Sequence, residues 1–249
     1  MNPFWLILVI VANMPSKASA NFICFKETTP IAWTFFLDTQ LHSSYIENEF
    51  SSNFLGAVME TFIAIAIGVG LSAACGFRVF VPLLIMNLAS ISGYLHLGSG
   101  FEWIGSYPAT VVFATATIIE IFAYYIPWLD HILDVVATPA AIIAGMVATA
   151  SVVTNVSPLL KWVLALIAGG GAAAVVQGAT STIRLKSTAL TAGIGNPVVA
   201  TAEWIGAAIT ALLAIVVPLI CLALILLLII FVVRKAGRLL FGRKIESHS

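Results

Sequence analysis

The chain of 249 residues is 61% hydrophobic and only 9% charged, and its mean hydropathy is +1.08. A soluble domain carries roughly 25% charged residues, so this composition excludes a water-soluble fold. Lys and Arg together number 11, as do Asp and Glu, and the resulting zero net charge argues against nucleic acid as a partner. The composition predicts a membrane protein surrounded by lipids.

Residues 1–58 differ in composition from the rest of the chain. An apolar run at residues 4–12 is too short to span a bilayer, and residues 21–58 show neither helical nor strand periodicity. At Met59 the composition changes abruptly to that of a membrane helix. We therefore expect Met59 to be the initiator and residues 59–235 to form the membrane domain. The alternative is that residues 1–58 are a disordered exported or cytoplasmic extension.

Long apolar runs make up most of the predicted membrane domain. A bilayer core of about 30 Å needs about 20 helical residues at about 1.5 Å each. Three runs fit a single crossing and two exceed it; they are residues 108–126, 135–153 and 159–183, and residues 60–92 and 198–233. The sequence predicts an all-α transmembrane helix bundle of five to seven segments, with six favoured.

Glycine and proline mark where these helices are expected to break. Gly76 and Arg78 interrupt the first long run, which predicts either two short helices or a broken helix with a re-entrant half. Pro218 near the middle of the last run predicts a kink or a tight turn. Further helix-breaking residues are Gly193, Gly195 and Pro197. Broken helices expose backbone groups that transporters use in their binding sites.

Basic residues follow the last apolar run directly and set the expected orientation. They are Arg234, Lys235, Arg238, Arg243 and Lys244. The positive-inside rule places the tail, residues 236–249, in the cytoplasm. The tail acts either as a stop-transfer signal or as a short amphipathic helix on the anionic leaflet.

Small residues are concentrated before two arginines, Arg78 and Arg184, and predict close contacts between helices. Each arginine is followed downstream by a glutamate in an apolar run, Glu120 or Glu203. This order suggests two diverged halves, as in internally repeated transporters. A chance likeness between two small-residue helices would give the same order.

Glu120 is the most conspicuous charge in an apolar run, about twelve residues into its expected span. An ionisable side chain at the bilayer centre costs about 2.5 to 3.5 kcal/mol, so such residues are candidates for function. Glu120 either pairs with a cation such as Arg78 or takes up and releases a proton. A purely structural ion pair is the alternative.

Asp130, His131 and Asp134 lie in a polar connection between two spans. On a helix Asp130 and Asp134 share a face, and His131 is three residues from Asp134, so the three form a candidate site for a divalent metal. Acidic residues at the start of a helix also complement its dipole, which explains them without a metal. The three cysteines form no CxxC pair, so no cofactor is expected.

A second polar island covers residues 181–197 and includes Arg184, Lys186 and Asn196. Its cations, hydroxyls and glycine break could form a site for an anion or a lipid phosphate that faces the next helix N-terminus. An ordinary cytoplasmic loop would have the same composition.

Three stretches together resemble a known family. They are residues 70–78 (GLSAACGFR) with Val81 and Pro82, residues 127–134, and residues 181–203. They resemble the bacterial multi-pass membrane family numbered four-one-two-six among the domains of unknown function. The resemblance covers about residues 59–235 and implies a polytopic inner-membrane protein. It implies no activity, so function has to be argued from the residues.

These observations favour a small transporter or channel-like protein. Arg78 and Arg184 would contact an anionic solute or a lipid headgroup, and Glu120 would couple protons. A structural or assembly protein without substrate is one alternative, and a metal-assisted lipid enzyme at Asp130 and its neighbours is another. The sequence contains no HExxH or P-loop motif, which argues against an enzyme. Expected partners are lipids, a small anionic substrate and further copies in a homo-oligomer.

Overall fold

The structure is a computed structural model that describes the backbone of residues 30–241. Side chains are described for residues 53–126, 133, 135–235, 237 and 238. All regular elements in this part of the chain are helices, which confirms the predicted all-α class. They are α2 (Pro30–Phe77), α3 (Phe80–Ile91), the 3-10 helix η2 (Glu102–Gly105), α4 (Tyr107–Ala123), α5 (Pro127–Val152), α6 (Pro158–Leu164), the π-helix η3 (Ala165–Gly170), α7 (Gly171–Thr191), α8 (Asn196–Val216) and α9 (Pro218–Phe241).

The chain divides into two compact units, Met1–Leu55 and Gly56–Ser249, and α2 contributes residues to both. The described residues of the first unit are helical. Residues 30–58 are thus helical, although their sequence shows no helical periodicity. Periodicity reveals only helices with one apolar face turned inward, and residues 53–58 are all exposed.

Five helical stretches are long and apolar enough to cross a membrane. They are Asn53–Phe77, Val135–Val152, Pro158–Thr191, Asn196–Val216 and Pro218–Lys235. Two shorter apolar helices, α3 and α4, accompany them. The chain is therefore a multi-pass membrane protein, and each of the two long apolar runs contains more than one helix.

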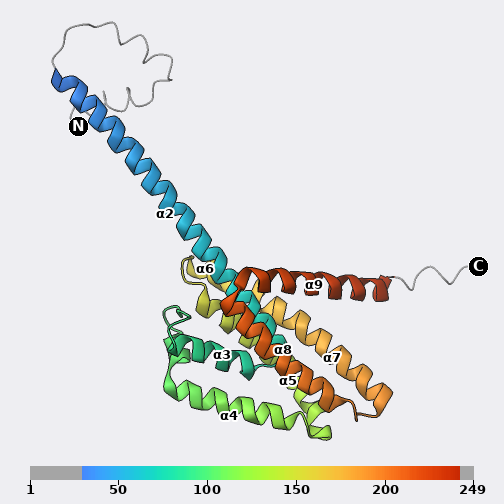
Figure 1. The fold of residues 1–249 in the computed structure, drawn as a ribbon. Helices are drawn as coiled ribbons and strands as arrows, with labels where there is room; N and C mark the ends of the chain where they lie inside the picture. Colours follow the sequence, from blue (N-terminus) through green and yellow to red (C-terminus); the bar gives the residue numbers. More distant parts are fainter. Residues whose placement is uncertain (1–29, 242–249) are drawn as a thin grey trace, which may run out of the picture. The chain divides into compact units, whose positions relative to one another are not determined.

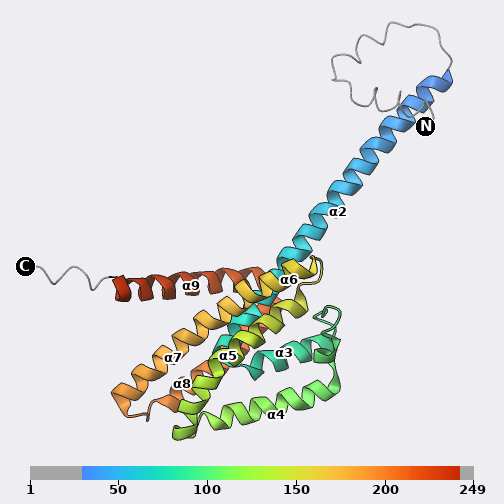
Figure 2. The ribbon, with the colours of Figure 1, turned by 180° about the vertical axis from the view of Figure 1, so that it is seen from behind.

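The helices of the second unit run between two ends of a bundle. At one end, called the loop end, the connection between α3 and α4 meets the last turn of α5, where the Gly98 amide donates to the Ser151 carbonyl at 2.7 Å. At the other end, called the hairpin end, Tyr125 after α4 bonds Thr201 on α8 at 2.8 Å. In Figures 1 and 2, α5 and α8 lie between α4 and α7.

Three helices meet closely at residues with little or no side chain. We call this contact the small-residue crossing; it comprises Gly68 and Ser72 of α2, Gly145 and Thr149 of α5, and Gly169 of η3. The Ser72 hydroxyl lies 2.6 Å from the Gly145 carbonyl oxygen and 2.7 Å from the Thr149 hydroxyl. A Cβ added to Gly169 would lie 2.7 Å from the same Gly145 oxygen. Small residues thus let the backbones touch, as predicted for helices packed in lipid.

A buried asparagine fixes the loop end. Asn87 is fully buried on α3, and its amide nitrogen donates to the carbonyls of Ile104 at 2.5 Å and Ser106 at 3.1 Å. Its amide oxygen accepts the Thr110 hydroxyl at 2.8 Å. One side chain therefore ties α3 to η2 and to the start of α4.

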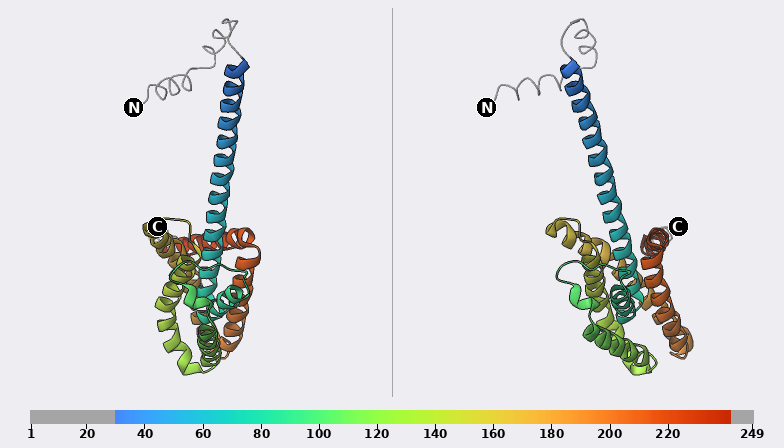
Figure 3. Two further views of the ribbon diagram at one scale, coloured as in Figure 1. Left: turned by 90° about the vertical axis from the view of Figure 1, so that its left-hand side faces the viewer. Right: turned by 60° about the vertical axis from the view of Figure 1, so that its left-hand side comes forward.

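Pro218 and the glycines around Gly193 lie at helix boundaries. Pro218 begins α9, which leaves the end of α8 at an angle in each view of Figure 3. Gly193 has a φ of +89°, a left-handed conformation that favours glycine, in the turn between α7 and α8. Gly195 lies in the same turn, where its amide donates to the Thr191 hydroxyl at 2.9 Å. Pro197 occupies the first turn of α8.

Candidate functional site

The break between α2 and α3 lies inside the bundle. A Cβ on Gly76, one residue before the end of α2, would lie 2.6 Å from the Ala173 carbonyl oxygen and 2.7 Å from the Val176 Cβ. Helix α7 continues for fifteen residues beyond Val176, to Thr191, which is about 22 Å at 1.5 Å per residue. Because α3 leads back to the loop end, α2 and α3 form a helical pair that turns around in the interior.

Glu120 of α4 accepts hydrogen bonds from the backbone amides at the start of α3. The first amides of a helix have no partner within that helix, and an unpaired amide in a bilayer is costly. The Glu120 carboxylate accepts the Val79 amide at 2.9 Å and the Phe80 amide at 3.0 Å. A negative charge at this position also complements the helix dipole. The positive charges of Arg78 and Arg184 act on the same carboxylate.

Two arginines from different helices share one carboxylate. Arg184 of α7 binds Glu203 of α8 through two parallel contacts, one of which joins Nε to Oε1 at 2.9 Å. Arg78, which follows α2, places its Nη2 atom 3.1 Å from the Glu203 Oε2 atom and 3.4 Å from the Ala200 carbonyl oxygen. Bidentate pairing of this kind is the strongest arrangement of a guanidinium group and a carboxylate.

The same two arginines stack on Tyr124. The guanidinium carbon of Arg78 lies 3.6 Å from the ring centroid, and that of Arg184 lies 4.0 Å from it. We call Arg78, Glu120, Tyr124, Arg184 and Glu203 the arginine cluster. Each of its side chains is no more than 8% exposed. Two positive and two negative groups therefore lie together in a low-dielectric setting, where their interactions are strong.

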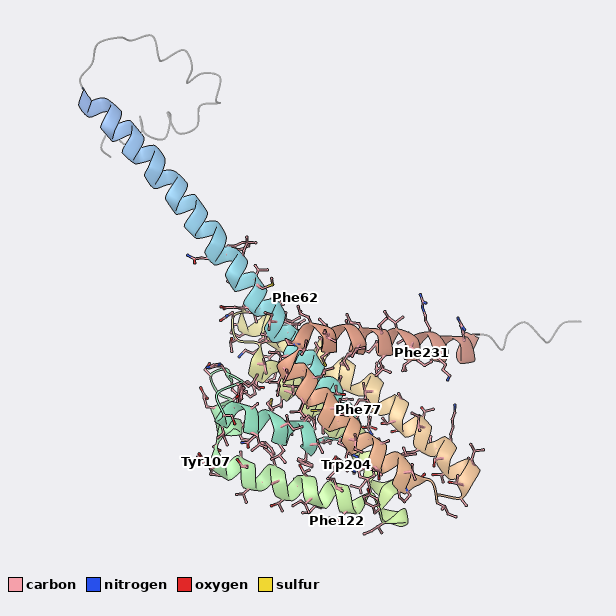
Figure 4. The ribbon with its side chains drawn as sticks, viewed as in Figure 1. Phe62, Phe77, Tyr107, Phe122, Trp204 and Phe231 are labelled. Atoms are coloured by element: carbon pink, nitrogen blue, oxygen red, sulfur yellow. The ribbon has the colours of Figure 1, made fainter. Side chains whose placement is uncertain are left out.

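The cluster is closer to the hairpin end than to the loop end. Arg184 lies seven residues before the end of α7 and Glu203 seven residues after the start of α8, so both are about 10 Å from the turn between these helices. Figure 4 labels Phe77, at the end of α2, and Trp204, which follows Glu203 on α8; a Cβ added to Gly206 of α8 would lie 3.8 Å from the Phe77 ring.

Four predicted site residues, Arg78, Glu120, Arg184 and Glu203, come together, whereas Lys186 and Asn196 do not join them. Lys186 is exposed on α7. Asn196 is buried at the start of α8, where its amide nitrogen and the Thr188 hydroxyl are 3.0 Å apart.

The proposed metal site cannot be placed in the same way. Asp130, His131 and Asp134 lie on α5, but their side chains are outside the described residues. Among the residues whose side chains are described, no three His, Cys, Asp or Glu residues are grouped so that they could hold a metal ion.

Tyr124 belongs to the site and was not predicted from the sequence. Tyr124 lies four residues after Glu120, and a spacing of four places residues on one helix face, so this signal was available. Thr117 lies three residues before Glu120 and is 8% exposed. Its hydroxyl has no hydrogen-bond partner among the described residues. A buried hydroxyl of this kind is a place where a water molecule can bind.

Residues 65–238 match the family model described as Domain of unknown function (DUF4126). The match confirms the family resemblance expected from the sequence. No curated protein and no solved structure matches the chain.

Proposed function

Because the chain belongs to the DUF4126 family, whose function is unknown, we propose a function from the arginine cluster: a small transporter for an anionic solute or lipid headgroup. The observation that carries the proposal is the sharing of the Glu203 carboxylate by two buried arginines from different helices. Buried charges inside membrane proteins commonly mark pathways for substrates and ions.

The arrangement supports anion exchange at the arginines. Glu203 already occupies the position where an anion would bind Arg78 and Arg184. An incoming carboxylate or phosphate can therefore take the place of Glu203 while both guanidinium groups stay paired. Simple dissociation of Glu203, in contrast, would leave them unpaired. Arginine presents a planar fork that suits both kinds of anion. A substrate anion would thus compete with an internal one.

Glu120 supplies the coupling to protons. With both glutamates ionised, the cluster carries two positive and two negative charges and is balanced. A proton taken up by Glu120 removes one negative charge and leaves the cluster with a net charge of plus one. That state attracts an anion, so proton and anion bind together. Release of the proton leaves the occupied cluster with a net negative charge and weakens the bound anion, which predicts transport of both in the same direction.

The position of the cluster supports a transport pathway that is shorter toward the hairpin end. The hairpin end lies about 10 Å away, whereas the small-residue crossing blocks the direction of the loop end with backbone contacts. Passage to the loop end therefore requires that helices move. A cycle of this kind is the general behaviour of transporters built from broken helices.

The proposal is tested with purified protein in liposomes that contain a pH indicator. We expect proton uptake when a small carboxylate or inorganic phosphate is added outside, and labelled lipids in the same vesicles report headgroup movement. Glu120→Gln should abolish the coupled proton uptake. Glu102→Gln is the matched control, since Glu102 is exposed on η2. Unchanged proton uptake in Glu120→Gln would rule out the coupling role.

A structural role is the second candidate, and the charge balance of the cluster favours it. If the cluster only holds helices together, a balanced pair can be replaced by apolar residues without loss, as in other proteins with buried ion pairs. The double variant Arg184→Met with Glu203→Leu removes one charge of each sign. A folded, stable double variant together with wild-type protein that moves no anion would support the structural role.

A further inference from the structure

Tyr124 contacts both arginines of the cluster without carrying a charge. The residue is 4% exposed, and the guanidinium carbons of Arg78 and Arg184 lie 3.6 Å and 4.0 Å from its ring centroid. The face of an aromatic ring attracts a cation through its quadrupole, and this attraction is stronger where water is excluded. The ring therefore fixes the position of two positive charges but neutralises neither of them.

Glu203 acts on the same arginines in a different way. Its Oε2 atom lies 3.1 Å from Nη2 of Arg78, and its Oε1 atom lies 2.9 Å from Nε of Arg184. A carboxylate positions the guanidinium groups and neutralises their charge at the same time. An anion that enters the cluster has to compete with Glu203, but it does not have to compete with the ring of Tyr124.

The two partners of the arginines also come from different helices. Glu203 lies on α8, whereas Tyr124 directly follows α4 and donates its amide to the Glu120 carbonyl at 3.4 Å. The Glu120 carboxylate is in turn bound to the amides of Val79 and Phe80 at the start of α3. A movement of the Glu203 side chain therefore does not by itself displace the ring.

The arginines need a second partner when their carboxylate is exchanged. Arg78 and Arg184 both lie within 4.0 Å of one ring centre, so their positive charges are close together and repel each other in a low-dielectric setting. Arginines that separated would have to be ordered again by the incoming anion, and a ligand that has to order side chains binds more weakly. Contact with a ring that stays in place avoids this loss of affinity.

We propose that Tyr124 is the positioning residue of the anion site, because its ring keeps Arg78 and Arg184 in place when Glu203 releases them. The inference rests on the proposed function for its anion, whereas the contact between the ring and the arginines can be tested without any anion. Two consequences follow. Anion affinity depends on the aromatic ring and not on the tyrosine hydroxyl, and the ring keeps its contribution to stability when Glu203 is neutralised.

The first test is a double-mutant cycle in unfolding, which requires neither transport nor an anion. The effect of Tyr124→Leu on the unfolding equilibrium constant is measured in the wild type and in Glu203→Gln, by reversible unfolding in mixed micelles with SDS. We expect at least as large a fold-change in Glu203→Gln, since the arginines stay on the ring. A smaller fold-change would show that they leave the ring together with the carboxylate, and it would overturn the proposal. Tyr125→Leu, at the exposed neighbouring tyrosine, is the control and should have the same effect in both backgrounds.

The second test is anion binding to the purified, folded protein, measured by equilibrium dialysis with radiolabelled inorganic phosphate and radiolabelled acetate. Tyr124→Phe keeps the ring and should bind like the wild type, as should the control Tyr125→Leu. Tyr124→Leu should bind about tenfold more weakly, and Tyr124→Met replaces it if the leucine variant does not fold. Wild-type affinity in the variant without a ring would overturn the positioning role. So would an equal loss in Tyr124→Phe, because the hydroxyl would then be the group that matters.

The two proposals fail separately. If the wild type binds no anion while Tyr124→Leu keeps its full effect on the stability of Glu203→Gln, the transport function is contradicted and the role of the ring is supported. If the wild type binds an anion and the variants without a ring bind it equally well, only the role of Tyr124 is contradicted.

Discussion

The arginine cluster and the small-residue crossing both hold α2 against α7 and its π-helix, but by opposite means. In the cluster, long charged side chains bridge the helices, and Glu203 contacts two arginines at once. In the crossing, side chains are nearly absent and the Gly145 carbonyl receives a single serine hydroxyl. The arginines of the cluster can exchange one bound anion for another. The backbone contacts of the crossing have no alternative partner.

The comparison indicates which contact is a fixed point and which one can move. Close backbone packing is lost completely when the helices separate, because nothing else fills the gap between them. A charged group can change partners when an equivalent ion is present. We therefore expect the two regions to respond differently to substitution, in the order given below.

The largest effect is expected when the shared carboxylate is removed. Glu203→Ala leaves two buried arginines without their common partner and should lower the free energy of unfolding by about 3 to 5 kcal/mol. Reversible unfolding in mixed micelles with SDS measures this change. Glu102→Ala, at an exposed glutamate, is the control and should unfold like the wild type. Equal losses in the two variants would contradict the buried pairing.

A smaller loss is expected when the crossing is forced apart. Gly169→Ala places a methyl group against the Gly145 carbonyl and the Thr149 side chain. Overpacking of this kind costs about 1 to 3 kcal/mol. Gly178→Ala serves as the control in the same unfolding experiment, since an added methyl group there meets no neighbour. If the two alanine variants are equally stable, the crossing is not a close contact.

A still smaller effect is expected from a single hydroxyl at the crossing. Ser72→Ala removes the bonds to Gly145 and Thr149 but leaves the backbone contact in place. Hydrogen bonds between membrane helices contribute about 0.6 kcal/mol on average. Thr115→Ala is the control, because Thr115 is exposed and bonds only its own helix, at the Val111 carbonyl. A loss comparable to that of Gly169→Ala would show that polarity, and not close approach, holds the crossing.

The smallest effect is expected at Lys186, which lies outside both regions. Exposed substitutions usually change stability by less than about 0.5 kcal/mol. Lys186→Gln should therefore leave both unfolding and anion transport unchanged. Loss of transport in this variant would extend the pathway beyond the arginine cluster toward the hairpin end.

The sequence predicted the membrane class, the helix breaks and four members of the cluster, because charges and glycines in apolar runs are conspicuous. It expected Glu120 either to pair with a cation such as Arg78, which follows a glycine break, or to carry a proton. The structure places Glu120 on the amides of Val79 and Phe80, and places Glu203 against Arg78. The carboxylate that meets Arg78 depends on how α8 packs, which periodicity does not reveal. The predicted internal repeat stays a prediction.

Other features could not be predicted because their signals are weak in a single sequence. Ser72, Asn87 and Thr149 are small polar residues of a kind that also occurs at lipid-facing and loop positions. Their roles depend on contacts between segments far apart in the chain. The π-helix likewise has no sequence mark beyond three successive glycines, of which only Gly169 and Gly170 are required by packing.

The support that Glu120 gives to α3 has a consequence for how the chain is made. Helix α3 has twelve residues, about 18 Å in length, so it cannot span a bilayer alone. The carboxylate that caps it is synthesised 41 residues after Val79. Until α4 has been synthesised, the first amides of α3 therefore lack the carboxylate that accepts them in the folded protein.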